Sequence, residues 1–207
     1  MLRVPYSPLD HIHQELHDPI EEAHSKVLES NWFVLGKQLE AFESEFADFV
    51  GVKHAVGVGS GHDALMLSLM AAGIGAGDEV ILPAHTFFAS ALAVYNAGAK
   101  PVLVDVDRKT CNIDVFAIER NINAKTRAIL PVHLYGNPCE MDPILDIAKK
   151  NGLLIVEDFA QAHGARYKQK SCGSIGHINA TSFYPAKNLG GIGDGGMITT
   201  ESDAMAS

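Results

Sequence analysis

Short, continuously apolar segments alternate with longer segments of helical spacing, and this alternation limits the possible folds more than any other feature of the chain. Strands are predicted at residues 54–58, 79–82, 101–106, 128–132, 153–157, 181–184 and 197–200, and helices at 17–34, 39–50, 63–72, 88–97 and 142–150. Strands that are apolar at successive positions are buried on both faces, so helices must cover both sides of the sheet. We therefore predict an α/β fold with a mostly parallel sheet, whose active crevice lies beyond the carboxyl ends of the strands.

The length of the chain, 207 residues, is enough for one large domain with a substantial core. We divide it into an N-terminal arm and helix, residues 1–35, and a large domain, residues 36–207. The segment from Glu201 starts like a helix, with Ser202 or Asp203 as the N-cap, and stops within its first turns. We therefore expect a large domain that is incomplete at its C-terminus.

Charge and composition exclude several classes of partner. The formal net charge of −9 argues against nucleic acid, and no apolar run has the length of a membrane span. Three widely spaced cysteines predict ordinary thiols in a reducing cytoplasm rather than disulfides. No metal site is predicted, because no carboxylate or cysteine completes a ligand pattern around the N-terminal histidines His11, His13, His17 and His24.

Lys187 stands between the last two predicted strands, in a segment rich in glycine. A lysine delivered to the interior loses solvation, its pKa falls, and its amine becomes a nucleophile, the usual partner of an aldehyde cofactor. Asp158 directly follows the apolar strand at 153–157. A carboxylate at this strand end would keep a pyridine nitrogen protonated. At about 4 Å and an effective dielectric near 20, that attraction is roughly 4 kcal/mol. The alternative for Asp158 is a helix cap or a surface charge.

The segment Ser60-Gly61-His62-Asp63 joins the first strand to a helix. The free N–H groups of that helix N-terminus either bind a phosphate, together with the hydroxyl of Ser182, or belong to an ordinary helix capped by Ser60 and Asp63. Phe87 and Phe88 follow another strand. One of these rings would stack on a flat cofactor, and the other would join the core. An amine, an anion for a ring nitrogen, a phosphate cradle and a stacking ring together describe pyridoxal 5′-phosphate.

Motifs along nearly the whole chain carry a resemblance to a known family. They are Gly36 with Phe42-Glu43, Ser60-Gly61, Gly77-Asp78-Glu79-Val80, Pro83 with Thr86-Phe87, Asp105-Val106-Asp107, Pro131-Val132-His133-Leu134-Tyr135-Gly136, Glu157-Asp158, Gln161-Ala162-His163-Gly164-Ala165, and Ser182-Phe183-Tyr184 before Lys187. With these motifs the chain resembles the DegT/DnrJ/StrS family of sugar-nucleotide aminotransferases. The resemblance implies the large domain of a fold-type-I, PLP-dependent transferase, truncated before the small C-terminal domain.

The resemblance also implies a role for each motif residue. Lys187 would form the Schiff base with the cofactor and shuttle the proton, and Asp158 would pair with the ring nitrogen. The remaining cofactor contacts would be ring stacking by Phe87, a contact near the phenolic oxygen by Gln161, and phosphate binding by Ser182, Gly61 and His62. The family usually has threonine where this chain has His62, so a hydroxyl contact to the phosphate would be lost or replaced by imidazole.

The implied reaction moves an amino group from an amino acid, usually L-glutamate, to a nucleotide-linked keto-sugar in amino-sugar or surface-polysaccharide biosynthesis. Relatives with histidine in place of the lysine are dehydratases, so Lys187 favours transamination. The implied enzyme is a cytoplasmic homodimer, and we expect a fragment ending at Ser207 to be inactive or poorly folded alone. Two alternatives remain: a non-catalytic binding or regulatory module, and a dinucleotide-dependent oxidoreductase suggested by Gly57-Val58-Gly59-Ser60-Gly61.

Overall fold

The computed structural model describes residues 9–207, except for the side chains of residues 10–13. The expectation that His11 and His13 bind no metal therefore lies outside the described residues, as do the first eight residues of the predicted arm. The described chain divides into two compact units, one ending at Phe42 and the other running from Glu43 to Ser207. The division into an arm of residues 1–35 and a domain of residues 36–207 stays a prediction.

The first unit contains helix α1 (Asp10–Ser30), which stops four residues before the predicted end at residue 34. Asn31 takes up the left-handed conformation, with φ of 52°, and so cannot continue a right-handed helix. The hydroxyl of Ser30 donates to the carbonyl of Val27 at 2.7 Å and accepts from the amide of Trp32 at 3.1 Å. The hydroxyl thus provides hydrogen bonds for a carbonyl and an amide at the end of the helix, which further helical turns would otherwise have provided.

Seven strands form the main sheet in the order β1-β9-β8-β5-β4-β2-β3. Their bounds are β1 (His54–Val58), β2 (Glu79–Pro83), β3 (Lys100–Val104), β4 (Thr126–Ile129), β5 (Leu154–Asp158), β8 (Ile178–Ser182) and β9 (Gly196–Thr200). β9 runs antiparallel to both of its neighbours, and the other neighbouring strands pair in parallel. The expected mostly parallel sheet is confirmed. A separate two-stranded ribbon consists of β6 (Arg166–Tyr167) and β7 (Lys170–Ser171).

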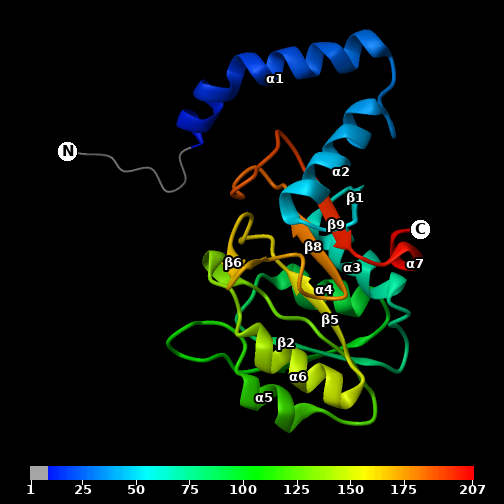
Figure 1. Ribbon diagram of the computed structural model, residues 1–207, viewed down its shortest axis with the longest axis vertical. Coiled ribbons are helices and arrows are strands. Elements are labelled where there is room, and N and C mark those ends of the chain that lie inside the picture. The colour runs from blue at the N-terminus through cyan, green and yellow to red at the C-terminus, as the bar shows by residue number, and fades with distance from the viewer. Residues whose placement is uncertain (1–8) are drawn as a thin grey trace, which may run out of the picture. The chain divides into compact units, whose positions relative to one another are not determined.

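Helices cover both faces of this sheet, as predicted (Figure 1). Successive residues of β2 show the division. Val80 and Leu82 pack in the apolar cluster that contains residues of α3 (Gly61–Ala71) and α4 (Phe88–Asn96). Ile81 packs in the cluster that contains residues of α5 (Val115–Asn121) and α6 (Met141–Asn151). The remaining helices are α2 (Lys37–Val50), α5 (Val115–Asn121), α6 (Met141–Asn151), the 3₁₀ turn η1 (Leu134–Gly136) and α7 (Asp203–Ala206).

The sequence prediction missed α5, a helix of seven residues that begins after Asp114. The carboxylate of Asp114 accepts a hydrogen bond from the amide of Phe116 at 2.9 Å and so caps the first turn. At the other end of the chain, α7 has Ser202 at its N-cap, as expected. No helix within residues 9–207 combines the length and the apolar character that crossing a bilayer requires.

Candidate functional site

The carboxyl ends of the parallel strands gather the predicted site residues at one edge of the sheet. β5 and β8 run parallel, with Asp158, the last residue of β5, paired with Ala180, two residues before the end of β8 at Ser182. β9 begins at this same edge, where Gly196 pairs with both Ser182 and Val58. Because Val58 is the last residue of β1, the N-terminus of α3 follows at the same edge.

Lys187 lies in the connection between β8 and β9 and is half-buried, so the expectation that it reaches the interior is wrong. Its amide donates to the carbonyl of Tyr184 at 2.8 Å, which keeps the segment in a tight turn. The charge of Lys187 still acts on two buried or partly buried groups. After burial, it is the second cause that lowers the pKa of His163 to about 4, and it also opposes the rise in the pKa of Asp158. Lys187 therefore lies in the same electrostatic environment as Asp158, not in bulk water.

Asp158 is 6% exposed at the end of β5. Burial raises the pKa of its carboxyl, and hydrogen bonds from Ala160 and Ser90 oppose this rise, followed by the charge of Lys187. The Ala160 amide donates to Oδ1 at 3.1 Å, and the Ser90 hydroxyl donates to Oδ2 at 2.9 Å. Asp158 is thus a buried carboxylate with bound donors, and the surface-charge alternative does not fit this geometry.

Ser90 is the residue of this site that sequence reasoning missed. It is 1% exposed in the first turn of α4, and its oxygen also lies 2.9 Å from the hydroxyl oxygen of Thr86. In the sequence it is a single small polar residue in Phe88-Ala89-Ser90-Ala91-Leu92, a pattern typical of any packed helix. One available signal was its place in the first turn of a predicted helix that follows a strand.

The predicted phosphate cradle is closely packed. Ser60 is the N-cap of α3, and its hydroxyl accepts from the amide of Asp63 at 3.1 Å. A Cβ added to Gly61 would lie 2.5 Å from the Cβ of Ser182, so only glycine allows these two segments to approach. The first amides of α3 lack intrahelical partners, as in any helix, and point their dipoles towards this edge.

The side chain of His62 is turned towards α4. Its Nε2 lies 3.1 Å from Nδ2 of Asn96, and its Nδ1 lies 3.5 Å from a carboxylate oxygen of Asp63. Asn96 can only donate through Nδ2, so Nε2 is the acceptor and Nδ1 carries the proton. The imidazole is therefore occupied by protein partners, and the backbone amide of His62 is the group that can face an anion.

The amide group of Gln161 has a fixed orientation. The backbone amide of Tyr135 donates to Oε1 of Gln161 at 2.8 Å. A backbone N–H only donates, so the oxygen must face Tyr135 and the NH₂ group is left to donate elsewhere. Tyr135 itself has a φ of 57°, an uncommon conformation for a side chain of this size, and its hydroxyl lies 3.3 Å from Nε2 of His85.

Phe87 and Phe88 both lie on the surface beyond β2, and their side chains are 70% and 69% exposed. The expectation that one of them joins the core is therefore wrong. α4 begins directly after Phe87, so the two rings leave the chain where it changes direction from strand to helix. An exposed ring at this strand end is available for stacking.

His163 is a packed residue of the site. Its Nε2 lies 2.7 Å from the hydroxyl oxygen of Thr181, and its ring stacks on Phe183 with 5.8 Å between centroids. Its Nδ1 is buried without a hydrogen-bond partner within residues 9–207. The lowered pKa keeps the ring neutral, so His163 adds no charge beside Lys187.

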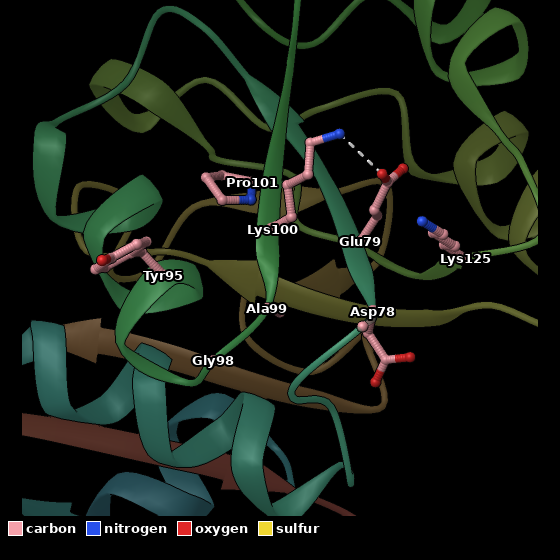
Figure 2. A pocket seen from close by; sticks show the side chains of 9 residues that line it. Asp78, Glu79, Tyr95, Gly98, Ala99, Lys100, Pro101 and Lys125 are labelled. Atoms are coloured by element: carbon pink, nitrogen blue, oxygen red, sulfur yellow. Dashed lines mark hydrogen bonds and ion pairs between the residues drawn. The ribbon is translucent and has the colours of Figure 1, made fainter.

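A pocket of about 300 Å³ lies at the opposite edge of the sheet, where β2 and β3 begin (Figure 2). Glu79 lines this pocket, and its carboxylate accepts from Nζ of Lys100 at 2.9 Å and from Nδ2 of Asn123 at 2.8 Å. This carboxylate is thus already satisfied by its neighbours. The pocket shares no residue with the cluster around Asp158.

Comparison with known proteins identifies relatives of the whole chain. Residues 14–207 match the DegT/DnrJ/EryC1/StrS aminotransferase family. A Streptomyces venezuelae dTDP-3-amino-3,4,6-trideoxy-alpha-D-glucose transaminase is 48% identical over 99% of this chain and 54% of its own length. A Geobacillus stearothermophilus protein named as a pleiotropic regulatory protein is 45% identical over 99% of this chain and 55% of its own.

Among solved structures, the crystal structure of ntda from Bacillus subtilis with bound cofactor PMP is 35% identical and superposes with a TM-score of 0.91. The match covers 100% of this chain and 47% of that one. The fold class expected from the resemblance is confirmed. The chain spans about half the length of these relatives.

Proposed function

Because the chain belongs to the DegT/DnrJ/EryC1/StrS aminotransferase family, we propose that it forms the cofactor-binding part of a pyridoxal-phosphate-dependent aminotransferase. The enzyme moves an amino group from an amino acid, L-glutamate, to a nucleotide-linked keto-sugar in amino-sugar or surface-polysaccharide biosynthesis. The observation that carries this proposal is the buried carboxylate of Asp158, which has a donor on each oxygen and ends β5 at the carboxyl edge of the sheet, with the half-buried Lys187 in the connection that follows the neighbouring strand β8.

The residues present fit pyridoxal phosphate. Asp158 is a buried anion that still has acceptor positions for the N–H of a pyridinium. Gly61 lies so close to Ser182 that any side chain would fill the space beside the first amides of α3 and the Ser182 hydroxyl. Amides at a helix N-terminus and a hydroxyl are the donors that a phosphate needs. Gln161 offers its NH₂ group, which suits a phenolate oxygen.

When bound, the cofactor supplies an electron sink for the negative charge that develops on the substrate carbon. Lys187 would hold the aldehyde cofactor through Nζ, and this amine would be the group that accepts and returns a proton at the reacting carbon. Asp158 would keep the proton on the ring nitrogen, which makes the sink effective. Phe87 would stack on the ring, and Ser182 with the amides of Gly61 and His62 would hold the phosphate.

The two alternatives differ in their support. A dinucleotide-binding site needs its glycine loop after a central parallel strand, whereas β1 lies at the end of the strand order beside the antiparallel β9. A regulatory role has one observation in its favour, the name of the Geobacillus relative. Lys187 and Asp158 in one environment favour the catalytic function, because a binding module requires neither a nucleophile nor a buried anion beside it.

Several finer features belong to the same proposal. The enzyme is cytoplasmic, in line with its three free cysteines, and works as a homodimer whose partner completes each site. The large domain begins at residue 36 and follows an N-terminal arm. Neither nucleic acid nor a membrane is a partner.

Replacement of Lys187 by alanine tests the proposal. In the full-length protein, Lys187→Ala is expected to lower transamination by roughly a thousandfold or more, because no other amine takes over bond formation and proton transfer. Lys168→Ala is the matched control, since Lys168 is exposed and pairs with Asp142. Borohydride reduction and peptide mass spectrometry should place a phosphopyridoxyl label on Lys187 in the wild type and in Lys168→Ala.

A label on another lysine, or a wild-type protein whose visible absorbance does not change with L-glutamate, would contradict the proposed function. A labelled protein that binds the cofactor but aminates no nucleotide keto-sugar in a substrate panel would instead support the regulatory alternative. Product mass and the position of the new nitrogen identify the sugar.

A further inference from the structure

We propose that Ser90 is a positioning residue for Asp158: its hydroxyl, itself held by Thr86, fixes the orientation of the carboxylate and keeps it ionised. The inference rests on the proposed function in one respect, the identity of the group that Asp158 binds. The hydrogen-bond chain from Thr86 through Ser90 to Asp158 is a property of the protein alone.

The direction of this chain follows from the number of protons available. Ser90 has one hydroxyl proton, and an ionised carboxylate can only accept, so the 2.9 Å contact to Oδ2 requires Ser90 to donate. The oxygen of Ser90 is then the acceptor for the hydroxyl of Thr86, also at 2.9 Å. Each bond polarises the next, and both oriented O–H groups point their positive ends towards Asp158.

Burial makes these donors important. Lys187, in the connection after β8, is a charged group that opposes the rise in the pKa of Asp158. Helix α4 has no charged side chain, and from this helix Ser90 donates its hydroxyl proton to Oδ2. Loss of this hydroxyl would remove from Oδ2 a donor in a buried position.

Ser90 and Ala160 together fix the orientation of the Asp158 carboxylate. Ser90 lies 68 residues before Asp158 in the sequence, and its bond fixes Oδ2 while the amide of Ala160 fixes Oδ1. With one donor on each oxygen, the plane of the carboxylate is set before any ligand arrives. The acceptor positions that remain are then directed into the site, where a ring nitrogen would be recognised.

The chain provides a matched control in Ser68, on the neighbouring helix α3. Ser68 is 0% exposed and Ser90 is 1% exposed, so alanine at either position removes a fully buried hydroxyl. The hydroxyl of Ser68 has no hydrogen-bond partner within residues 9–207. A general effect of packing or polarity would appear in both variants, whereas an effect on Asp158 would appear only in Ser90→Ala.

The first experiment needs no cofactor. Urea unfolding of the cofactor-free full-length protein is followed from pH 4 to pH 8 for the wild type, Ser90→Ala, Ser90→Cys and Ser68→Ala. When burial raises the pKa of a carboxyl in the folded state, the free energy of unfolding of the protein falls as the pH rises. Ser90→Ala should raise the pKa of Asp158 further. The destabilisation by Ser90→Ala should therefore grow with pH, that of Ser90→Cys should be smaller because a thiol is a weak donor, and that of Ser68→Ala should not change with pH.

The second experiment titrates pyridoxal 5′-phosphate into the same proteins and follows visible absorbance. Ser90→Ala should bind about tenfold more weakly at neutral pH, the effect of roughly one hydrogen bond to a charged group. Its affinity should also fall at a higher pH than that of the wild type when the solution is acidified. Thr86→Val should give a smaller change in the same direction, and Ser68→Ala should bind as the wild type does.

The outcomes separate this inference from the proposed function. Destabilisation by Ser90→Ala that does not depend on pH, or that Ser68→Ala reproduces, would overturn the positioning role whatever the cofactor is. A pH-dependent loss of stability in a protein that does not bind pyridoxal phosphate would uphold the role of Ser90 and refute the proposed function. Normal cofactor binding by the wild type with equal affinity in Ser90→Ala would refute the inference alone.

Discussion

A single missing side chain governs the approach of two segments at the candidate site. The backbone at Gly61 and the side chain of Ser182 lie closer than a Cβ on residue 61 would permit. β9 pairs with both β1 and β8, and its Gly196 lies against the carbonyl of Ser60. Donors from two distant parts of the chain are thereby brought to one point. The geometry of the site therefore depends on the absence of a side chain at Gly61 as much as on the hydroxyl of Ser182.

Alanine at Gly61 tests this contact. The added methyl group would force the first turn of α3 and Ser182 apart, and overpacking of this kind costs about 1–3 kcal/mol. We expect Gly61→Ala to lower the free energy of unfolding by that amount and to weaken binding of pyridoxal phosphate. Gly75→Ala is the control, since its Cβ would lie 3.6 Å from the carbonyl oxygen of Ala97, an ordinary contact. Equal cofactor affinity in both variants would contradict the proposed phosphate cradle.

Residues of the site differed in how well the sequence predicted them. Lys187 and Asp158 stood out because charged groups next to apolar strands need an explanation. Ser90 did not, because its partner lies far away in the sequence and a lone serine is compatible with any packed helix. The half-buried position of Lys187 was not predicted either, since the burial of a lysine in a connection depends on how that connection folds.

The elements at the site are joined by a buried pair, His133 and Glu157, both 0% exposed. Nε2 of His133 lies 2.8 Å from Oε2 of Glu157, and Nδ1 accepts from the amide of Cys139 at 3.0 Å, so the proton is on Nε2. Glu157 also accepts from the amides of Gly173, Ile175 and Gly176. The carboxylate thus ties β5 to the segment after β4 and to the loop before β8, with Asp158 as the next residue.

Replacement of Glu157 by glutamine tests this connection. Burial alone would raise the pKa of Glu157, but the hydrogen bonds from His133, Gly173 and Gly176 hold it below its usual value. Glu157→Gln places an NH₂ group against these donors and should lower the free energy of unfolding by about 1–3 kcal/mol. A depressed carboxyl pKa gives stability that is lost as the pH falls through it, so the difference from wild type should narrow in acid.

Urea unfolding at several pH values measures this effect. The exposed Glu119 of α5 is the control, and Glu119→Gln should stay within about 0.5 kcal/mol of the wild type. A deficit in Glu157→Gln that stays constant down to low pH would show that the charge of this residue has no part in the connection.

Elements were predictable where local pattern and burial agree. The β2 strand and the core of β5 appeared in the sequence because they are continuously apolar and buried on both faces. The reversed direction of β9 was not predictable, since an apolar strand carries no sign of whether it runs parallel or antiparallel to its neighbour. α5 was missed because seven residues give too few turns for a periodic pattern.

The molecule as a whole carries a buried charge that weakens its fold in the cofactor-free state. Burial raises the pKa of Asp158, which means that the folded chain favours the neutral form of this group. Such a group contributes stability at low pH that is lost as the pH rises through its folded pKa. The carboxylate that would bind the cationic ring nitrogen therefore lowers the free energy of unfolding of the cofactor-free protein at neutral pH.

We expect Asp158→Asn to unfold at a higher temperature than the wild type at pH 7 in the absence of cofactor, because the buried charge is removed. The advantage should shrink as the pH falls, since the wild-type carboxyl is then protonated as well. Pyridoxal phosphate at 100 times its Kd stabilises a protein by about 2.7 kcal/mol, and this gain should appear in the wild type but not in Asp158→Asn. Thermal scans with and without cofactor measure both effects, with the exposed Asp146→Asn as the control. A lower melting temperature for cofactor-free Asp158→Asn would contradict this account.

The position of β1 has a consequence for the order of assembly. Within the main sheet its neighbour is β9, which begins 138 residues after β1 ends. A ribosome makes β1 early, at a time when the strand that will pair with it does not yet exist. The β8–β9 pair closes over residues 183–195, a far shorter separation than that between β1 and β9, and β1 can add only to the far side of β9 afterwards. β1 is thus synthesised early but joins the sheet late. Until then its backbone N–H and C=O groups are unpaired and can form hydrogen bonds with other chains.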